Sequence, residues 1–363
     1  MFNHFYFGRL KMLRRILGAS LRTLPIACTA VAALAVASNA DAQIVTPYTA
    51  DADTLYLYSF DEAAGGGVAA NEGTAGFNAV GFSNPFAGST SDQPVNTGLL
   101  GATGFTGFGN AATIGAGNGF GVDVDGSGGF RAVSGSTAVT ARPDDLLQSD
   151  VLGTTGSFTV EALVNLSSLG AQQEIIATDA AFTAGLGGNA SRGFQFRINN
   201  NNNLEFQYIG DGVISPVLSG DLTTLGGGNA LVTGEWFHAA AVFTSSGVVD
   251  GDGNTVGTTE LFFTRVDAGA TIANSVGSAS DLVDFTDLGP LTIGNEARTA
   301  NNATGGNQFG EALLGSIDEV RISSVARGAD EFIFAEATTI PEPGSLALLG
   351  LGAVVGLARR RKS

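Results

Sequence analysis

The chain has 363 residues, a formal net charge of −17 and a single cysteine, Cys28. Such an acidic protein will not bind nucleic acid or anionic lipid through charge, which excludes these partners as electrostatic targets. Cys28 lies in an N-terminal segment that we expect to be removed, so the mature protein should have neither disulfides nor thiol chemistry.

Residues 1–42 have the pattern of a secretory signal peptide with an apolar helix. An apolar run from Pro25 to Ala37 is followed by Ala40-Asp41-Ala42, where signal peptidase would cut after Ala42. Met12 is an alternative start, because the pattern is complete from there, and a retained membrane anchor is the alternative to cleavage. The basic residues that precede the apolar run are Arg9, Lys11, Arg14, Arg15 and Arg22.

The body between the two terminal segments is far more acidic than the whole chain. It keeps eight arginines and 32 acidic residues, a net charge of −24. This charge suits a protein that stays soluble outside the cell, and it leaves carboxylates free to bind divalent cations.

Short alternating or β-rich segments recur along the body, with little helical periodicity. Five asparagines, 199–203, lie between two of them and predict a hairpin turn, because asparagine tolerates left-handed φ. Together these short β-rich segments predict an all-β fold, a two-sheet antiparallel jelly-roll sandwich. The predicted strands are 53–60, 121–126, 157–165, 173–177, 193–198, 204–208, 235–243, 259–266, 291–294 and 313–322, with a short closing helix over 329–337.

Residues 63–120 and 138–152 are predicted as loops, because glycine and small polar residues dominate them. Phenylalanines are spaced through the first of these stretches, and we expect them to anchor loops to the sheets; lining a binding face is the alternative. They are Phe77, Phe82, Phe86, Phe105, Phe108 and Phe120.

Four segments occur in the order typical of one family: Tyr56–Glu62, Gly156–Val164, Trp236–Phe243 and Leu314–Ile322. With them, the body resembles the LamG-like, concanavalin A-like jelly-roll family. The resemblance implies a domain over residues 43–338 that binds glycan or protein. The chain departs from the family in a Gly-rich insert near 83–120 and a long loop at 246–258.

The last residues, 339–363, form a three-part tail. It begins with a stiff tripeptide, Pro341, Glu342 and Pro343, because proline fixes φ. An apolar run of 15 residues follows. The run is shorter than the ~20 residues that a spanning helix needs. The chain closes on a cluster of Arg359, Arg360, Arg361 and Lys362, which would stay cytoplasmic.

This tail resembles the PEP-CTERM sorting signal of Gram-negative surface proteins. The resemblance implies recognition of Pro341–Pro343 by an exosortase, a short transmembrane helix before processing, and arrest of translocation at Arg359–Lys362. It also implies export across the inner membrane to the cell surface or extracellular matrix, often beside exopolysaccharide. A helix packed on the domain is the alternative.

Catalytic groups are not evident in the body. His238 is its one histidine, and no nucleophile and acid at suitable spacing complete a triad, so we expect a structural histidine. The Glu-x-Asp-x-x-Glu strand of jelly-roll glycosidases is absent, and Asp318 and Glu319 should face opposite sides of a strand. We therefore expect a protein that is not an enzyme.

Calcium is the one cofactor that the sequence suggests. Asp250, Asp252 and Asn254 alternate in a Gly-rich loop, and Glu260 would add a carboxylate. A plain hairpin turn is the alternative, and Asp123 with Asp125 is a weaker candidate.

The expected function is therefore that of an exported surface or matrix protein whose domain binds glycan or a surface protein. A purely structural matrix component and a polysaccharide-active enzyme are the alternatives.

Overall fold

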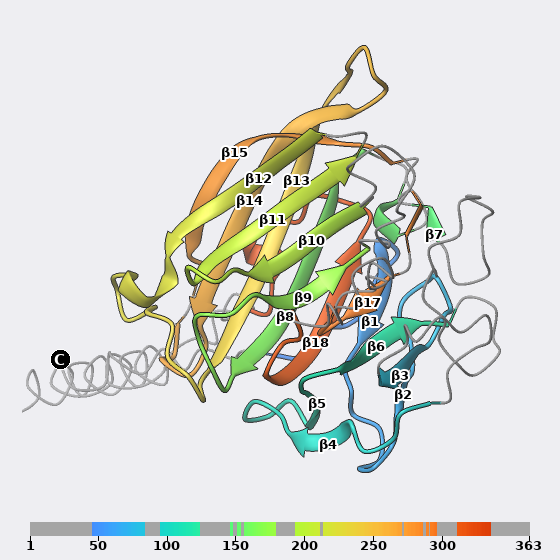
Figure 1. The fold of residues 1–363 in the computed structure, drawn as a ribbon, viewed down its shortest axis with the longest axis vertical. Coiled ribbons are helices and arrows are strands. Elements are labelled where there is room, and N and C mark those ends of the chain that lie inside the picture. Colours follow the sequence, from blue (N-terminus) through green and yellow to red (C-terminus); the bar gives the residue numbers. More distant parts are fainter. Residues whose placement is uncertain are drawn as a thin grey trace, which may run out of the picture. The chain divides into compact units, whose positions relative to one another are not determined.

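In the computed structural model, two antiparallel sheets form a sandwich (Figure 1). This confirms the predicted all-β jelly-roll class. No helix among the described residues is long and apolar enough to span a membrane. The predicted signal peptide and sorting tail lie outside the described residues, which are 46–83, 95–123, 146–147, 151–153, 156–178, 193–210, 213–270, 272–285, 288–289, 291–295 and 311–334.

The first sheet contains five neighbouring long strands, of 9 to 14 residues each, that pair in antiparallel register. Its order is β15 (Ser275–Val283), β14 (Thr255–Arg265), β13 (Trp236–Val249), β8 (Phe158–Leu166), β18 (Gly315–Ser323), β5 (Asn110–Ile114) and β4 (Leu100–Thr103). Strand β1 (Thr54–Tyr58) also pairs with β18, beyond the part of β18 that pairs with β5.

The second sheet covers the first. Its order is β12 (Val213–Asp221), β11 (Asn203–Gly210), β10 (Gly193–Ile198), β9 (Gln173–Ala177), β17 (Thr292–Ile293), β6 (Asn118–Val122), β3 (Ala79–Ser83) and β2 (Val68–Ala69). Two short strands, β7 (Leu146–Leu147) and β16 (Leu288–Gly289), pair separately, and one 3-10 turn, η1 (Leu222–Thr224), follows β12.

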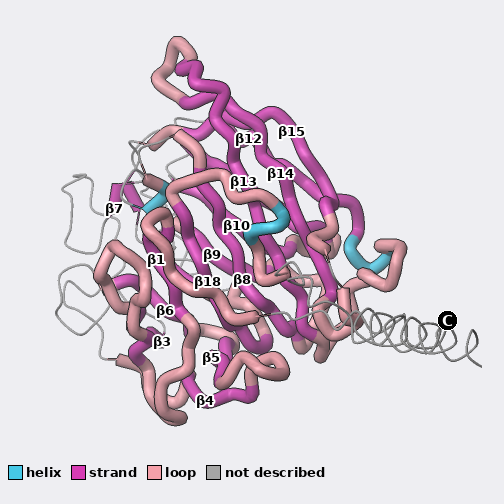
Figure 2. The backbone as a smooth tube through the Cα atoms, turned by 180° about the vertical axis from the view of Figure 1, so that it is seen from behind, coloured by secondary structure: helices cyan, strands magenta, loops and turns pink. Residues whose placement is uncertain are grey.

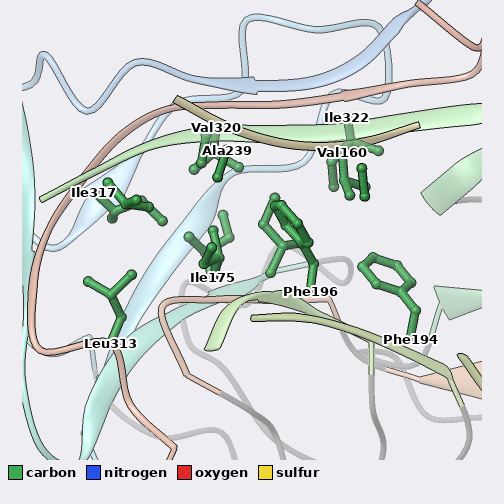
Figure 3. Close-up of a cluster of buried hydrophobic side chains, with 14 of the residues drawn as sticks. Val160, Ile175, Phe194, Phe196, Ala239, Leu313, Ile317, Val320 and Ile322 are labelled. Carbon is green, nitrogen blue, oxygen red and sulfur yellow. The ribbon is translucent and has the colours of Figure 1, made fainter. Parts of the chain in front are cut away.

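The main core lies between the two sheets. Strand β8 turns Phe158, Val160, Ala162 and Val164 inward, as its alternation predicts. Figure 3 shows residues of the first sheet, among them Val160 and Val320, facing Phe194 and Phe196 of the second sheet. Full burial of one such side chain contributes about 1.5–3 kcal/mol.

The glycine-rich stretch 63–120 was predicted as loop and contains strands β2 to β6, so that prediction was wrong. These strands have two to five residues, mostly Gly, Ala and Val, and lack the long alternation that marks a strand in sequence. Phe108 is a buried loop residue, as the anchoring prediction requires, whereas Phe82 and Phe120 are buried residues of strands β3 and β6 and anchor no loop. Phe86 lies outside the described residues.

A second apolar cluster covers the outer face of the first sheet, the side seen in Figure 2. Tyr48 from the N-terminal segment and Phe332 and Phe334 from the C-terminal segment pack there on Trp236 and Phe262. In the described part of the predicted helix over 329–337, one 3-10 turn, η2 (Ala329–Glu331), is followed by aromatic residues that pack against the sheet, and residues 335–337 lie outside the described ranges.

Edge strand β15 carries a buried carboxyl that should make stability depend on pH. Burial raises the pKa of Asp281 to about 6, although the hydrogen bond that Thr259 Oγ1 donates to the carboxylate (2.7 Å) acts to lower it. Because the folded pKa exceeds the unfolded value, stability is full below pH ~4 and falls as pH rises to ~6. Between these pH values the wild type should lose about 2 kcal/mol of unfolding free energy through Asp281, and Asp281→Asn should abolish this loss. Urea unfolding of both proteins at pH 4 and pH 7 measures the difference. An unchanged difference between the two pH values would contradict this.

Candidate functional site

The outer face of the second sheet carries a polar cluster centred on Arg197 of β10. Its guanidinium donates to Glu205 Oε1 (2.8 Å), Glu311 Oε2 (2.7 Å) and Gln207 Oε1 (3.2 Å). Asn199 Nδ2 donates to the second oxygen of Glu205, at 2.8 Å. The cluster therefore joins two neighbouring strands to the segment that leads into β18.

Strand alternation places these groups on the outer face. On β10, Phe194, Phe196 and Ile198 enter the core, so Gln195 and Arg197 point outward. On β11, Leu204 and Phe206 enter the core, and the register sets Glu205 directly opposite Arg197.

The third strand and the segment before β18 complete the cluster. Glu174 of β9 is the partner of Arg197 on the other side of β10. Glu174 N donates to Glu311 O (2.6 Å), which fixes the segment that carries the Glu311 side chain.

Among the described residues, the cluster holds more negative than positive charge. Burial disfavours the charged guanidinium, but Glu174, Glu205 and Glu311 outweigh burial and raise the pKa of Arg197. The side chains of Arg197 and Glu205 keep only 8% of their surface exposed. Shielding from bulk water strengthens the hydrogen bonds that fix these groups.

A second polar network is buried under the aromatic cover of the first sheet. Glu161 Oε1 accepts from Arg321 Nε (2.6 Å), and Glu161 Oε2 lies 3.1 Å from His238 Nε2 and also bonds the Tyr48 hydroxyl. Burial acts to raise the pKa of Glu161, but Arg321 and His238 lower it overall. His238 is fully buried, as expected for a structural histidine.

The prediction that Asp318 and Glu319 face opposite sides of a strand was wrong. Ile317 and Val320 both enter the core, so the residues between them form a bulge that points outward, with φ of 50° at Glu319. Both carboxyls are buried: burial raises the pKa of Asp318 to about 9 and that of Glu319 to about 7.

The structure brings three of the four predicted calcium ligands together, in the β13–β14 turn. Asp250 Oδ1 accepts from the backbone N–H groups of Asp252 (2.9 Å) and Asn254 (2.8 Å), as in a hairpin turn. Glu260 lies mid-strand on β14, about 17 Å from Thr255 at the turn by strand rise, and accepts from Ser275 Oγ (2.5 Å). It is therefore not brought to the other three.

The remaining candidates add little to a metal site. Asp123 is buried, and its N–H donates to Asn78 O (2.9 Å), while Asp125 lies outside the described residues. Within the described ranges, no group of three or more His, Cys, Asp or Glu side chains is placed to hold a metal ion. The sorting residues Pro341–Pro343 and Arg359–Lys362 also lie outside these ranges.

Comparison with protein families matches two models. Residues 133–332, more than half of the chain, match the concanavalin A-like lectin/glucanases superfamily. The chain belongs to this superfamily. Residues 339–362 match the PEP-CTERM protein-sorting motif, so the lectin-like domain is followed by a sorting signal. Both predicted resemblances are confirmed.

Solved structures resemble this superfamily member only distantly. The Ruminococcus gnavus IT-sialidase CBM40 bound to α2,3-sialyllactose is 15% identical over 49% of this chain and 80% of that one, with a TM-score of 0.32. Trypanosoma rangeli sialidase is 13% identical over 85% of this chain and 38% of that one, with a TM-score of 0.40. A search of curated proteins found no match.

The Arg197 cluster was missed in the sequence because its members come from three distant segments. Alternation over 193–198 and 204–208 places Gln195, Arg197, Glu205 and Gln207 on one face, and that was the available signal. Nothing in the spacing connects Glu311 to them.

Proposed function

We propose that the protein is an exported, non-catalytic glycan-binding protein of the bacterial surface or matrix. The observation that carries this proposal is the Arg197 cluster. Sites for small polar ligands combine a few fixed donors and acceptors, and this face offers a guanidinium, amides and carboxylates held by mutual hydrogen bonds. Membership in a lectin-like superfamily and the sorting motif are consistent with it.

Charge indicates which glycans this face favours. Among the described residues three carboxylates surround one guanidinium, and the chain as a whole has a net charge of −17. Anionic sugars would be repelled, whereas the hydroxyls of neutral sugars both donate to carboxylates and accept from the guanidinium and amides. A neutral, hydroxyl-rich polysaccharide is therefore the ligand class that we propose.

A glycan array with the purified protein tests this function. We expect retention on neutral glycans and none on sialylated or sulfated ones, at 150 mM salt. Binding to no glycan would favour the purely structural alternative. Release of reducing ends from a retained polysaccharide would instead favour an enzyme.

The tail makes a separate prediction about processing. Replacing Pro341, Glu342 and Pro343 by alanine removes the rigid motif that we propose an exosortase reads. We expect the form with a processed C-terminus to fall at least tenfold and full-length protein to accumulate in the membrane fraction, measured by mass spectrometry and immunoblot of fractions. Changing Thr338 and Thr339 to alanine is the control; equal processing of the motif variant and this control would contradict the prediction.

A further inference from the structure

An apolar strip borders the polar cluster on the outer face of the second sheet. Figure 1 shows β10, β11 and β12 side by side in this sheet. On β12, Val217 enters the core, so Pro216 and Leu218 point outward. The register sets Leu218 opposite Glu205 and Pro216 opposite Gln207. The two apolar side chains of the strip therefore lie directly beside two polar members of the cluster.

The strip is open to solvent, whereas the polar groups beside it are held in place. Leu218 keeps 45% of its surface exposed, and Pro216 is exposed as well. Glu205 and Gln207 keep only 6% and 9%. Sites for small ligands combine an apolar wall with a few oriented polar atoms, and this part of the face has that composition.

The amide of Gln207 has a fixed orientation. Arg197 has only donors, and its Nη2 donates to Gln207 Oε1 (3.2 Å), so the amide oxygen faces the guanidinium and the amide nitrogen is turned away from it. Within the described part of the chain, this nitrogen makes no hydrogen bond. Its two N–H groups are therefore available to a ligand beside the strip.

The guanidinium of Arg197 keeps one further donor. Of its five N–H groups, the one on Nε and one on Nη2 bond Glu205 Oε1 (3.3 and 2.8 Å), one on Nη1 bonds Glu311 Oε2 (2.7 Å), and one on Nη2 bonds Gln207. The second N–H of Nη1 has no partner among the residues that the structure describes. The donors left over favour a ligand that carries an uncharged acceptor next to an apolar group.

We propose that the strip and the Gln207 amide bind the acetamido group of an N-acetylated neutral sugar, an inference that rests on the proposed function and narrows its ligand class. The carbonyl oxygen of the acetamido group would accept from Gln207 Nε2, which carries donors and no acceptor. Its methyl group would pack on Leu218 and Pro216. The spare N–H of Arg197 and the carboxylates remain for the ring hydroxyls of the same sugar.

Matched pairs of sugars test this inference. Chitotetraose and cellotetraose share one β-1,4-linked backbone and differ in an acetamido or hydroxyl group at C2, and the methyl glycosides of N-acetylgalactosamine and galactose form a second pair. In calorimetric titrations of the purified protein, we expect the acetylated member of at least one pair to bind at least tenfold more tightly, roughly the discrimination that one small apolar group in a pocket provides.

The outcomes separate this inference from the proposed function. Equal affinities within both pairs, or no binding of any of the four sugars, would overturn the acetamido inference. Retention of other neutral glycans on the array would then still support the proposed function, whereas an array without any retained glycan would remove both.

Two variants locate the acetamido group. Gln207→Glu keeps the oxygen that bonds Arg197 but loses both N–H donors, and Leu218→Ser removes the apolar side chain at an exposed position. Each should reduce the preference for the acetylated sugar about fivefold or more. Val248→Ser, at a position that is 56% exposed on the first sheet, is the matched control and should keep the full preference.

The ratio of the two Kd values within a pair is the readout, because a general loss of structure would weaken both sugars alike. An unchanged ratio in both Gln207→Glu and Leu218→Ser would show that the acetamido group does not bind at the strip.

Discussion

Arg321→Met is expected to lower the free energy of unfolding by about 3–5 kcal/mol, the usual cost of leaving a buried charge without its partner. Glu161 is fully buried, and Arg321 Nε bonds its Oε1 at 2.6 Å. The guanidinium also lies 3.7 Å from the centre of the Tyr48 ring, so the N-terminal segment loses a cation–π contact as well. Chemical denaturation at pH 7 measures the loss.

Removing a charge nearer the surface should lower the free energy of unfolding much less. Arg265→Met breaks a partly exposed ion pair with Glu235, whose side chains keep 24% and 28% of their surface exposed, and should cost less than about 1 kcal/mol. The double variant Arg321→Met with Glu161→Gln should recover part of the loss, because the stranded carboxylate is gone. Equal losses in Arg321→Met and Arg265→Met would show that the buried network does not stabilise the fold as described.

Arg197→Met is the second substitution with a large expected effect, again about 3–5 kcal/mol. It would remove the positive partner that bonds both Glu205 and Glu311, two buried carboxylates. The substitution would also remove the electrostatic attraction between Arg197 and Glu174. The loss should also appear as faster amide hydrogen exchange in β10 and β11, because the cluster joins them to the segment before β18.

Neutralising one carboxylate should soften this effect. Arg197→Met combined with Glu205→Gln is expected to be more stable than Arg197→Met alone, since the carboxylate that has lost its guanidinium is neutralised. If the double variant is no more stable than the single one, the excess of carboxylates does not control the stability of this face.

Much of the fold could be predicted from sequence, for a specific reason. Strands such as 157–165 and 193–198 have one face in the core, and their alternating apolar residues report this directly. The edge strand β15 was missed because its residues are largely small and polar, and β12 was missed because Pro216 interrupts it and proline is rare inside strands. Period-two hydrophobicity is weak in such strands.

The sites could be predicted less well than the strands, because contacts over long sequence distances build them. Residues 174, 197, 205 and 311 meet only when three strands and a later segment pack together. At Asp318 and Glu319 the sequence suggested strict alternation, and a bulge with φ of 50° at Glu319 changed which side the second carboxyl faces.

The central claim is that the outer face of the second sheet binds a neutral glycan. It is tested most directly by calorimetric titration of the best neutral ligand from the array into three proteins: wild type, Gln207→Ala on this face, and Ser280→Ala on the exposed side of β15. We expect Gln207→Ala to raise the Kd at least tenfold, about 1.4 kcal/mol, with Ser280→Ala unchanged and both variants folded. A Kd for Gln207→Ala equal to that of the wild type would contradict the claim.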